Sequence, residues 1–151
     1  MLCLLAANTV QGEEDGQPLR FTISRKTEGS SATSLGDIWG TFKNVSEGDV
    51  RLLKLPDSSN SLRFWFSMVV ANTNGTPVLD TPVGGKISLR GLQEYILIKP
   101  QESYHFRLDH SRLMPELPSG VFHIKVIYRN QYGEDCFCGI LESNSIDVEI
   151  R

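Results

Sequence analysis

Apolar and polar residues alternate with a period of two in six segments of this chain. The longest of these segments covers residues 62–70, in which five large apolar side chains share one face. Such a pattern turns one face of a strand toward a core and the other toward water, and it is typical of antiparallel sheets. The other segments are 20–24, 38–43, 103–109, 122–129 and 146–151, and shorter strand candidates are 50–55, 86–89, 93–98 and 137–142.

Turn-forming residues lie between these segments, where strands must end. Examples are Asn74-Gly75, Gly84-Gly85 and Pro118-Ser119-Gly120, since glycine, asparagine and proline supply the backbone angles of tight turns. No stretch of a dozen residues has the three- and four-residue apolar spacing of an amphipathic helix. Short strands at regular intervals, without helices between them, predict an all-β sandwich or barrel.

Length and net charge limit the classes of protein to which this chain can belong. A chain of 151 residues corresponds to one domain and is long enough to bury its own core. A net charge of −3 without a dense Lys/Arg cluster argues against a nucleic-acid partner. No apolar run approaches the roughly 18 residues of a membrane-spanning helix, so we expect no transmembrane segment. Three cysteines are too few for a disulfide scaffold.

The N-terminal segment differs from the rest of the chain. Residues 1–7 are apolar, and residues 12–17 are polar and rich in carboxylates. This order is typical of the end of a secretory signal peptide, although the basic residues that normally come first are absent. The alternative is an ordinary first strand with a frayed end. We set residues 1–17 apart as a signal-like or disordered segment, expect export, and assign residues 18–151 to one β-sandwich domain.

The C-terminal third resembles a known fold family. Residues 99–130, KPQESYHFRLDHSRLMPELPSGVFHIKVIYRN, are followed by CGILESNSIDVEI at 138–150. Together they resemble the C-terminal half of bacterial immunoglobulin-like and fibronectin-III-like domains, with Gln101 at a usual glycine and Phe122 at a usual tyrosine. The resemblance implies an all-β, immunoglobulin-like antiparallel β-sandwich of about seven to nine strands. It implies no activity, because one fold can carry many functions.

The chain shows no constellation of residues for catalysis or for a metal. Its three histidines, His105, His110 and His123, do not have the spacing to cysteines that a zinc or copper site needs. No serine lies in a nucleophile motif, and no glycine-rich phosphate loop precedes a helix. We therefore predict a protein that is not an enzyme and that holds no cofactor or metal.

Cys136 and Cys138 allow three interpretations. In an extended strand, residues two apart point to one face with Cα atoms about 7 Å apart, at the limit for a disulfide. If the chain is exported, a short disulfide between these two could form in a bulge or turn. Alternatively, both thiols are reduced and pack as small apolar side chains, or they serve a redox or metal role.

Four large side chains are candidates for a binding surface. Trp39 and Trp65 lie opposite the main apolar residues of their segments, so they form either a second layer of core or an aromatic patch. Leu113 and Met114 follow a strand candidate in a proline-bounded segment. They either cover the open end of the sandwich or are exposed to a partner.

These observations favour a non-enzymatic, exported binding or structural accessory module with a protein or carbohydrate partner. The alternative is a small β-sandwich protease inhibitor. It would present the three longest loops, residues 25–36, 72–85 and 109–120, to an active-site cleft, because loops on a rigid scaffold commonly carry recognition.

Overall fold

The computed structural model describes residues 16–26, 37–54, 62, 64–80, 94–110, 113 and 116–151. Within these ranges the chain forms strands and no α-helix, and no helix there is long and apolar enough to cross a membrane. The strands are β1 (Leu19–Lys26), β2 (Asp37–Asn44), β3 (Val50–Leu53), β4 (Phe66–Asn72), β5 (Pro77–Asp80), β6 (Tyr95–Ile98), β7 (Ser103–Leu108), β8 (Gly120–Asn130), β9 (Gly139–Glu142) and β10 (Ile146–Ile150).

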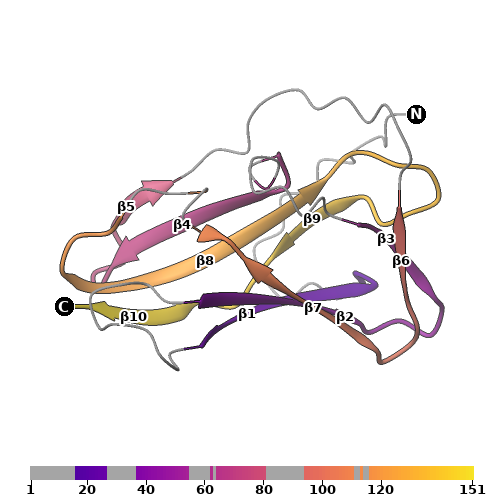
Figure 1. The fold of residues 1–151 in the computed structure, drawn as a ribbon, viewed down its shortest axis with the longest axis horizontal. Helices are drawn as coiled ribbons and strands as arrows, with labels where there is room; N and C mark the ends of the chain where they lie inside the picture. Colours follow the sequence, from indigo (N-terminus) through magenta and orange to yellow (C-terminus); the bar gives the residue numbers. More distant parts are fainter. Residues whose placement is uncertain are drawn as a thin grey trace.

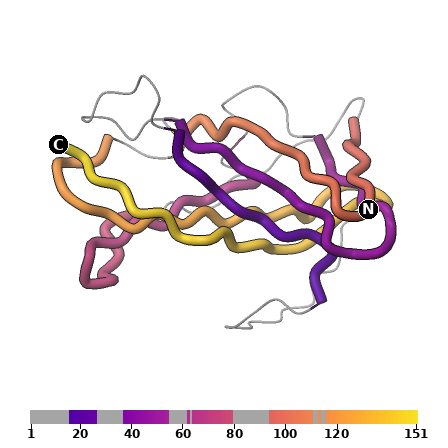
Figure 2. The backbone as a smooth tube through the Cα atoms, turned by 90° about the horizontal axis from the view of Figure 1, so that it is seen from below, coloured from indigo at the N-terminus to yellow at the C-terminus, as the bar shows by residue number. Residues whose placement is uncertain are grey.

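The strands form two layers. One sheet has the order β1-β2-β7, and the other has the order β10-β8-β4-β5 with β9 also paired to β8. Strands β3 and β6 form a separate two-stranded sheet, and every pairing is antiparallel. Seen from below, the β1-β2-β7 layer lies over the layer that contains β8 (Figures 1 and 2). The prediction of an all-β antiparallel sandwich is confirmed.

The strand number exceeds the predicted seven to nine because the last strand is interrupted. Both β9 and β10 pair with β8, and Ser143, Asn144 and Ser145 lie between them. Asn144 turns toward the other sheet: its Oδ1 accepts from the Ile23 backbone N–H at 2.8 Å, and its Nδ2 donates to the Ile23 carbonyl at 3.1 Å. One side-chain amide thus satisfies backbone groups on the outer edge of β1, where they would otherwise be open to pairing with another chain.

The segment 62–70 does not form one continuous strand, contrary to the prediction. The backbone N–H of Trp65 donates to the Leu62 carbonyl at 3.0 Å, so a turn precedes β4, which begins at Phe66. The turn moves Trp65 out of the two-residue alternation and into the core, where it is 1% exposed. The strand candidate at residues 86–89 lies outside the described residues.

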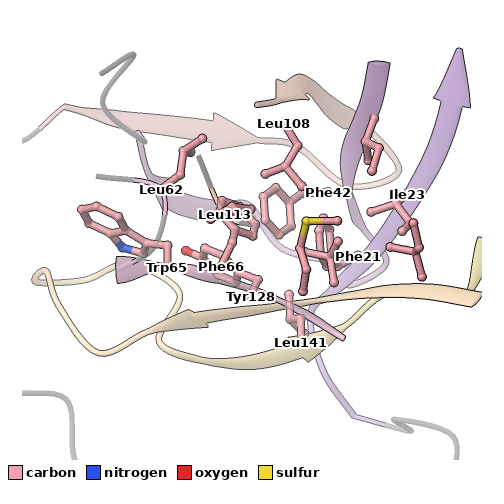
Figure 3. Packing of buried hydrophobic residues seen from close by; sticks show 14 of the residues in the cluster. Phe21, Ile23, Phe42, Leu62, Trp65, Phe66, Leu108, Leu113, Tyr128 and Leu141 are labelled. Carbon is pink, nitrogen blue, oxygen red and sulfur yellow. The ribbon is translucent and has the colours of Figure 1, made fainter. Parts of the chain in front are cut away.

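The core between the two layers is aromatic at its centre. Phe21 and Phe42 stack with their centroids 4.8 Å apart, and the ring of Tyr128 meets Phe42 edge-on at 4.9 Å. Phe66 lies 5.4 Å from Tyr128 (Figure 3). Each fully buried ring contributes about 2 kcal/mol through removal of apolar surface from water, so this cluster supplies much of the force that holds the layers together.

Two buried asparagines shape the end of the sandwich at which β3 and β6 lie. Asn44 donates to the carbonyls of Gly48 and Ile98 at 2.7 and 2.8 Å, and its Oδ1 accepts from Ser46. Asn130 donates to the Phe137 carbonyl at 2.8 Å and accepts from the Tyr132 N–H at 2.9 Å. Both amides replace missing backbone partners in turns, which makes these turns part of the rigid frame.

Candidate functional site

The outward side chains of β1, β2 and β7 form a surface that we call the cationic face. Alternation along the three strands turns their apolar residues inward and leaves a polar set on the outside. The set contains four cationic side chains and one carboxylate. Its members are Arg20, Thr22, Ser24 and Lys26 of β1, Asp37, Trp39, Thr41 and Lys43 of β2, and Ser103, His105 and Arg107 of β7.

The strand register arranges these residues in cross-strand rows. At one end Arg20 lies opposite Lys43, which lies opposite Ser103. The next row is Thr22, Thr41 and His105, followed by Ser24, Trp39 and Arg107. Lys26 and Asp37 form the last row. Cations therefore occupy both ends of the face, and hydroxyl groups occupy its middle.

Trp39 is the aromatic centre of one end. Lys26 places its Nζ 4.3 Å from the centroid of the Trp39 ring, a cation–π contact that contributes roughly 0.5–1 kcal/mol at an exposed site. Arg107, in register with Trp39, pairs with Asp37 at 2.8 Å. The indole N–H of Trp39 is buried and has no hydrogen-bond partner among the described residues. Trp39 thus holds an ammonium group over a half-buried ring beside a guanidinium group.

The middle of the face offers hydrogen-bonding groups. Thr41 Oγ1 lies 2.9 Å from Nδ1 of His105, and Thr22 is the register partner of Thr41 on the other side. Hydroxyl and imidazole groups can both donate and accept hydrogen bonds. This row can therefore bind a ligand that carries hydroxyl groups of its own.

The four candidate surface residues do not come together on one surface in the structure. Trp39 lies on the cationic face and is partly exposed. Trp65 and Leu113 are only 1% and 7% exposed and belong to the core, so of the two interpretations given for each residue the structure agrees with burial and not with a binding surface. The turn closed by the hydrogen bond from Trp65 to Leu62 places Trp65 in the core. Leu113 packs in the same apolar cluster. Met114 lies outside the described residues.

The cations of the face were missed in the sequence. Arg20, Lys26, Lys43 and Arg107 are single charges on polar sides of separate strands, where an isolated charge normally does no more than keep a strand soluble. Their common location depends on the order β1-β2-β7, which places residues from both halves of the chain on one surface. The one feature of the sequence that indicates an outward position for these cations is that each lies on the side of its strand opposite the inward-facing apolar residues.

Of the three interpretations of Cys136 and Cys138, neither a disulfide between the two nor a pair of reduced thiols agrees with the structure. Cys136 has a free thiol, whereas Cys138 is disulfide-bonded, so the two do not join each other. Phe137 between them is buried; its N–H donates to the Arg51 carbonyl and its own carbonyl accepts from Asn130, both at 2.8 Å. The two sulfurs lie near the same Tyr132 carbonyl, at 3.4 and 3.7 Å, so they remain unjoined because the Cys138 sulfur is already bonded and not because the backbone holds them apart. Cys3 lies outside the described residues.

The Cys136 thiol is expected to react slowly with thiol reagents at neutral pH. Burial raises its pKa, an effect that the side-chain hydrogen bond from Asn130 opposes, and the thiolate is the reactive species. Labelling of the folded protein with a chromogenic disulfide should be slower than labelling of glutathione at pH 7.5 and should accelerate as the pH rises. The Cys136→Ala variant is the control, and labelling as fast as that of glutathione would contradict the expectation.

Comparison with known proteins supplies no functional assignment. No protein-family model matches the chain, and no curated protein matches it significantly. Any functional conclusion therefore comes from the chemistry of the cationic face.

Proposed function

We propose that this protein is a non-enzymatic, exported, immunoglobulin-like module that binds its partner through the cationic face. The strand order supports the immunoglobulin-like part: β1, β2 and β7 correspond to strands A, B and E, and β10, β8, β4 and β5 to G, F, C and C′. The residues that resemble this family form β7 to β10. Export in this proposal is supported by the disulfide-bonded Cys138, because disulfides persist in oxidising compartments.

The observation that carries the proposal is the charge of the face. The whole chain has 15 Lys and Arg against 18 Asp and Glu, yet this face has four cations, Arg20, Lys26, Lys43 and Arg107, against Asp37 alone. A surface of one sign attracts ligands of the other sign and raises their association rate. Within an acidic protein, such a concentration of positive charge favours recognition of an anionic partner.

The proposal can be tested by binding to an array of immobilised glycans and acidic peptides. A ligand of the face should lose at least about tenfold in affinity with Trp39→Ala, since truncation of a tryptophan at a binding surface commonly costs this much. Lys26→Gln should also weaken binding because it removes the cation that Trp39 orients. This second variant is informative even if Trp39→Ala folds poorly.

The matched control is Lys125→Gln. Lys125 lies on β8, in the other sheet, and pairs with Glu142 at 3.0 Å. Binding should be unchanged in this variant. If every bound probe is held equally well by wild type, Trp39→Ala and Lys26→Gln, the cationic face is not the binding surface.

A protease inhibitor is the second candidate, and one observation favours it. The strand ends that border the loops 25–36 and 109–120 are neighbours, because Lys26 pairs with Asp37 and Ile38 pairs with Leu108. The turn after β4, where the loop 72–85 begins, lies toward the same end of the sandwich (Figure 2). Inhibition of serine or cysteine proteases at micromolar protein would support this function, and an unaffected panel would remove it.

A further inference from the structure

Two cations lie directly opposite each other at one end of the cationic face. Arg20 of β1 and Lys43 of β2 are register partners, and neither forms an ion pair with any other residue that the structure describes. Like charges in directly opposed positions destabilise a sheet. This arrangement is unfavourable for the protein alone and becomes favourable when an anionic group binds between the two side chains.

A second cationic pair lies at the other end of the face. Lys26 and Arg107 flank Trp39 there, and Asp37 balances only one of the two charges. Arg20 and Lys26 are six residues apart along β1, which corresponds to about 20 Å in an extended strand. A single small anion can occupy one end only. A ligand that uses the whole face must be extended and must carry several anionic groups.

The middle of the face distinguishes between classes of extended anion. Between the two cationic ends lie Thr22, Thr41 and His105, which offer hydrogen bonds, and Ser24 adds a hydroxyl group beside Trp39. Trp39 is the one apolar side chain of this surface, whereas the centre of a protein interface is enriched in aromatic and apolar residues. An array of hydroxyl groups with one aromatic ring fits the hydroxyl groups of sugars better than it fits a polypeptide.

We infer that the ligand of the cationic face is an extended polyanionic polysaccharide, with anionic groups at Arg20/Lys43 and at Lys26/Arg107 and sugar hydroxyls over the threonine row. The inference rests on the proposed function and adds the class of ligand. The ligand lies along the strands of β1 and β2, and Trp39 keeps Lys26 in position at one end.

Binding of heparin-derived oligosaccharides of increasing length tests this inference by titration calorimetry. Affinity should rise with length until the oligosaccharide spans both ends of the face, and it should fall as salt is added. The double variant Arg20→Gln/Lys43→Gln should bind about tenfold more weakly, because it removes two solvent-exposed ionic contacts, each of modest strength. Lys54→Gln/Lys125→Gln removes two exposed lysines elsewhere and should bind as wild type does.

Stability and binding should move in opposite directions in Lys43→Glu. The change replaces the opposed like charges by opposite charges, and we expect the melting temperature to rise by about 1–3 °C. Binding of the oligosaccharide should fall at least as far as in the double variant. Loss of binding together with a lower melting temperature would indicate a damaged sheet and would contradict the assigned role of the pair.

The comparison probes separate failure of this inference from failure of the proposed function. Dextran, which is neutral, should not bind. Equal binding of poly-L-glutamate would overturn the inference and identify the ligand as an acidic polypeptide. Binding to phosphatidylserine vesicles alone would overturn it and identify the ligand as a lipid surface. A neutral glycan bound through Trp39 would overturn the inference and leave the proposed function intact. If no probe binds through the face, both are wrong.

Discussion

Replacing Gly40 with alanine is expected to destabilise the protein by about 3 kcal/mol, at the upper end of the cost of overpacking a core. Gly40 lies in the middle of β2, opposite Ile23 and Phe106. A Cβ atom built at this position would lie 2.3 Å from Cζ of Phe106. Alanine is otherwise no worse than glycine in a strand interior, so the expected loss arises from packing alone.

Three aromatic neighbours restrict movement of the partly buried Phe106 ring. It stacks on Phe42 at 5.3 Å and on Phe21 at 6.3 Å, and Phe66 lies 5.5 Å away on a tilted plane. A core packed at this density responds to an added methyl group by strain rather than by rearrangement. The absence of a side chain at Gly40 is therefore what allows Phe106 to enter the aromatic cluster.

Thermal and urea unfolding measure this effect. At this chain length, 3 kcal/mol corresponds to a decrease in melting temperature of about 6–12 °C. The control is Gly48→Ala, at which a built Cβ meets nothing within 4 Å, so its stability should stay within about 0.5 kcal/mol of wild type. In Gly40→Ala/Phe106→Leu, the loss should be smaller than the sum of the two single losses. Equal stability of Gly40→Ala and Gly48→Ala would contradict the packing argument.

This packing also sets the geometry of the cationic face. Trp39 and Thr41 flank Gly40 in β2, and His105 and Arg107 flank Phe106 in β7. The inward contact between Gly40 and Phe106 therefore determines how closely the outward residues of the two strands approach. A variant that disturbs it should weaken ligand binding without any change in the ligand-contacting residues.

The alternation in the sequence was sufficient for the fold class but not for the site. Burial of Ile124, Val126 and Tyr128 beside partly exposed neighbours follows directly from the two-residue period. Trp39 was a candidate for the same reason, since it lies opposite inward-facing residues. The charges that surround it come from three strands, and a single sequence does not say which strands are neighbours.

The failures have local causes that a periodic pattern cannot express. Trp65 appeared to lie on a strand, but a turn closed by its hydrogen bond to Leu62 buries it. Cys136 and Cys138 appeared close enough to pair, but the sulfur of Cys138 is bonded to a sulfur other than that of Cys136. In each case contacts from distant segments, or a non-repetitive turn, override the local spacing of residues.

Raising the pH above 10 is expected to destabilise the protein through Tyr128. This side chain is fully buried in the aromatic cluster, and its hydroxyl group has no hydrogen-bond partner among the described residues. Burial raises the pKa of Tyr128 far above its ordinary value of 10.0, and the nearby Cys136 adds to the effect. The folded state therefore keeps the phenol neutral at pH values where the unfolded chain releases the proton.

The direction of the pH effect follows from this difference. A group whose pKa is higher in the folded state stabilises the fold fully below the unfolded pKa, and this contribution is lost as the pH rises. Each pH unit above 10 should cost about 1.4 kcal/mol, or close to 3 kcal/mol at pH 12. Unfolding by urea at pH 8, 10, 11 and 12 measures the slope.

Tyr128→Phe isolates the contribution of this hydroxyl group. At pH 8 the variant should be at least as stable as wild type, because it removes a buried polar group without a partner and keeps the ring. Between pH 10 and 12 its stability should decline less steeply than that of wild type, by about 1.4 kcal/mol per pH unit. Tyr104→Phe is the matched control, since its ring is only partly buried at the edge of the same cluster. Equal slopes for wild type and Tyr128→Phe would show that Tyr128 ionises without unfolding, and a lower stability of the variant at pH 8 would reveal a hydrogen bond to its hydroxyl group.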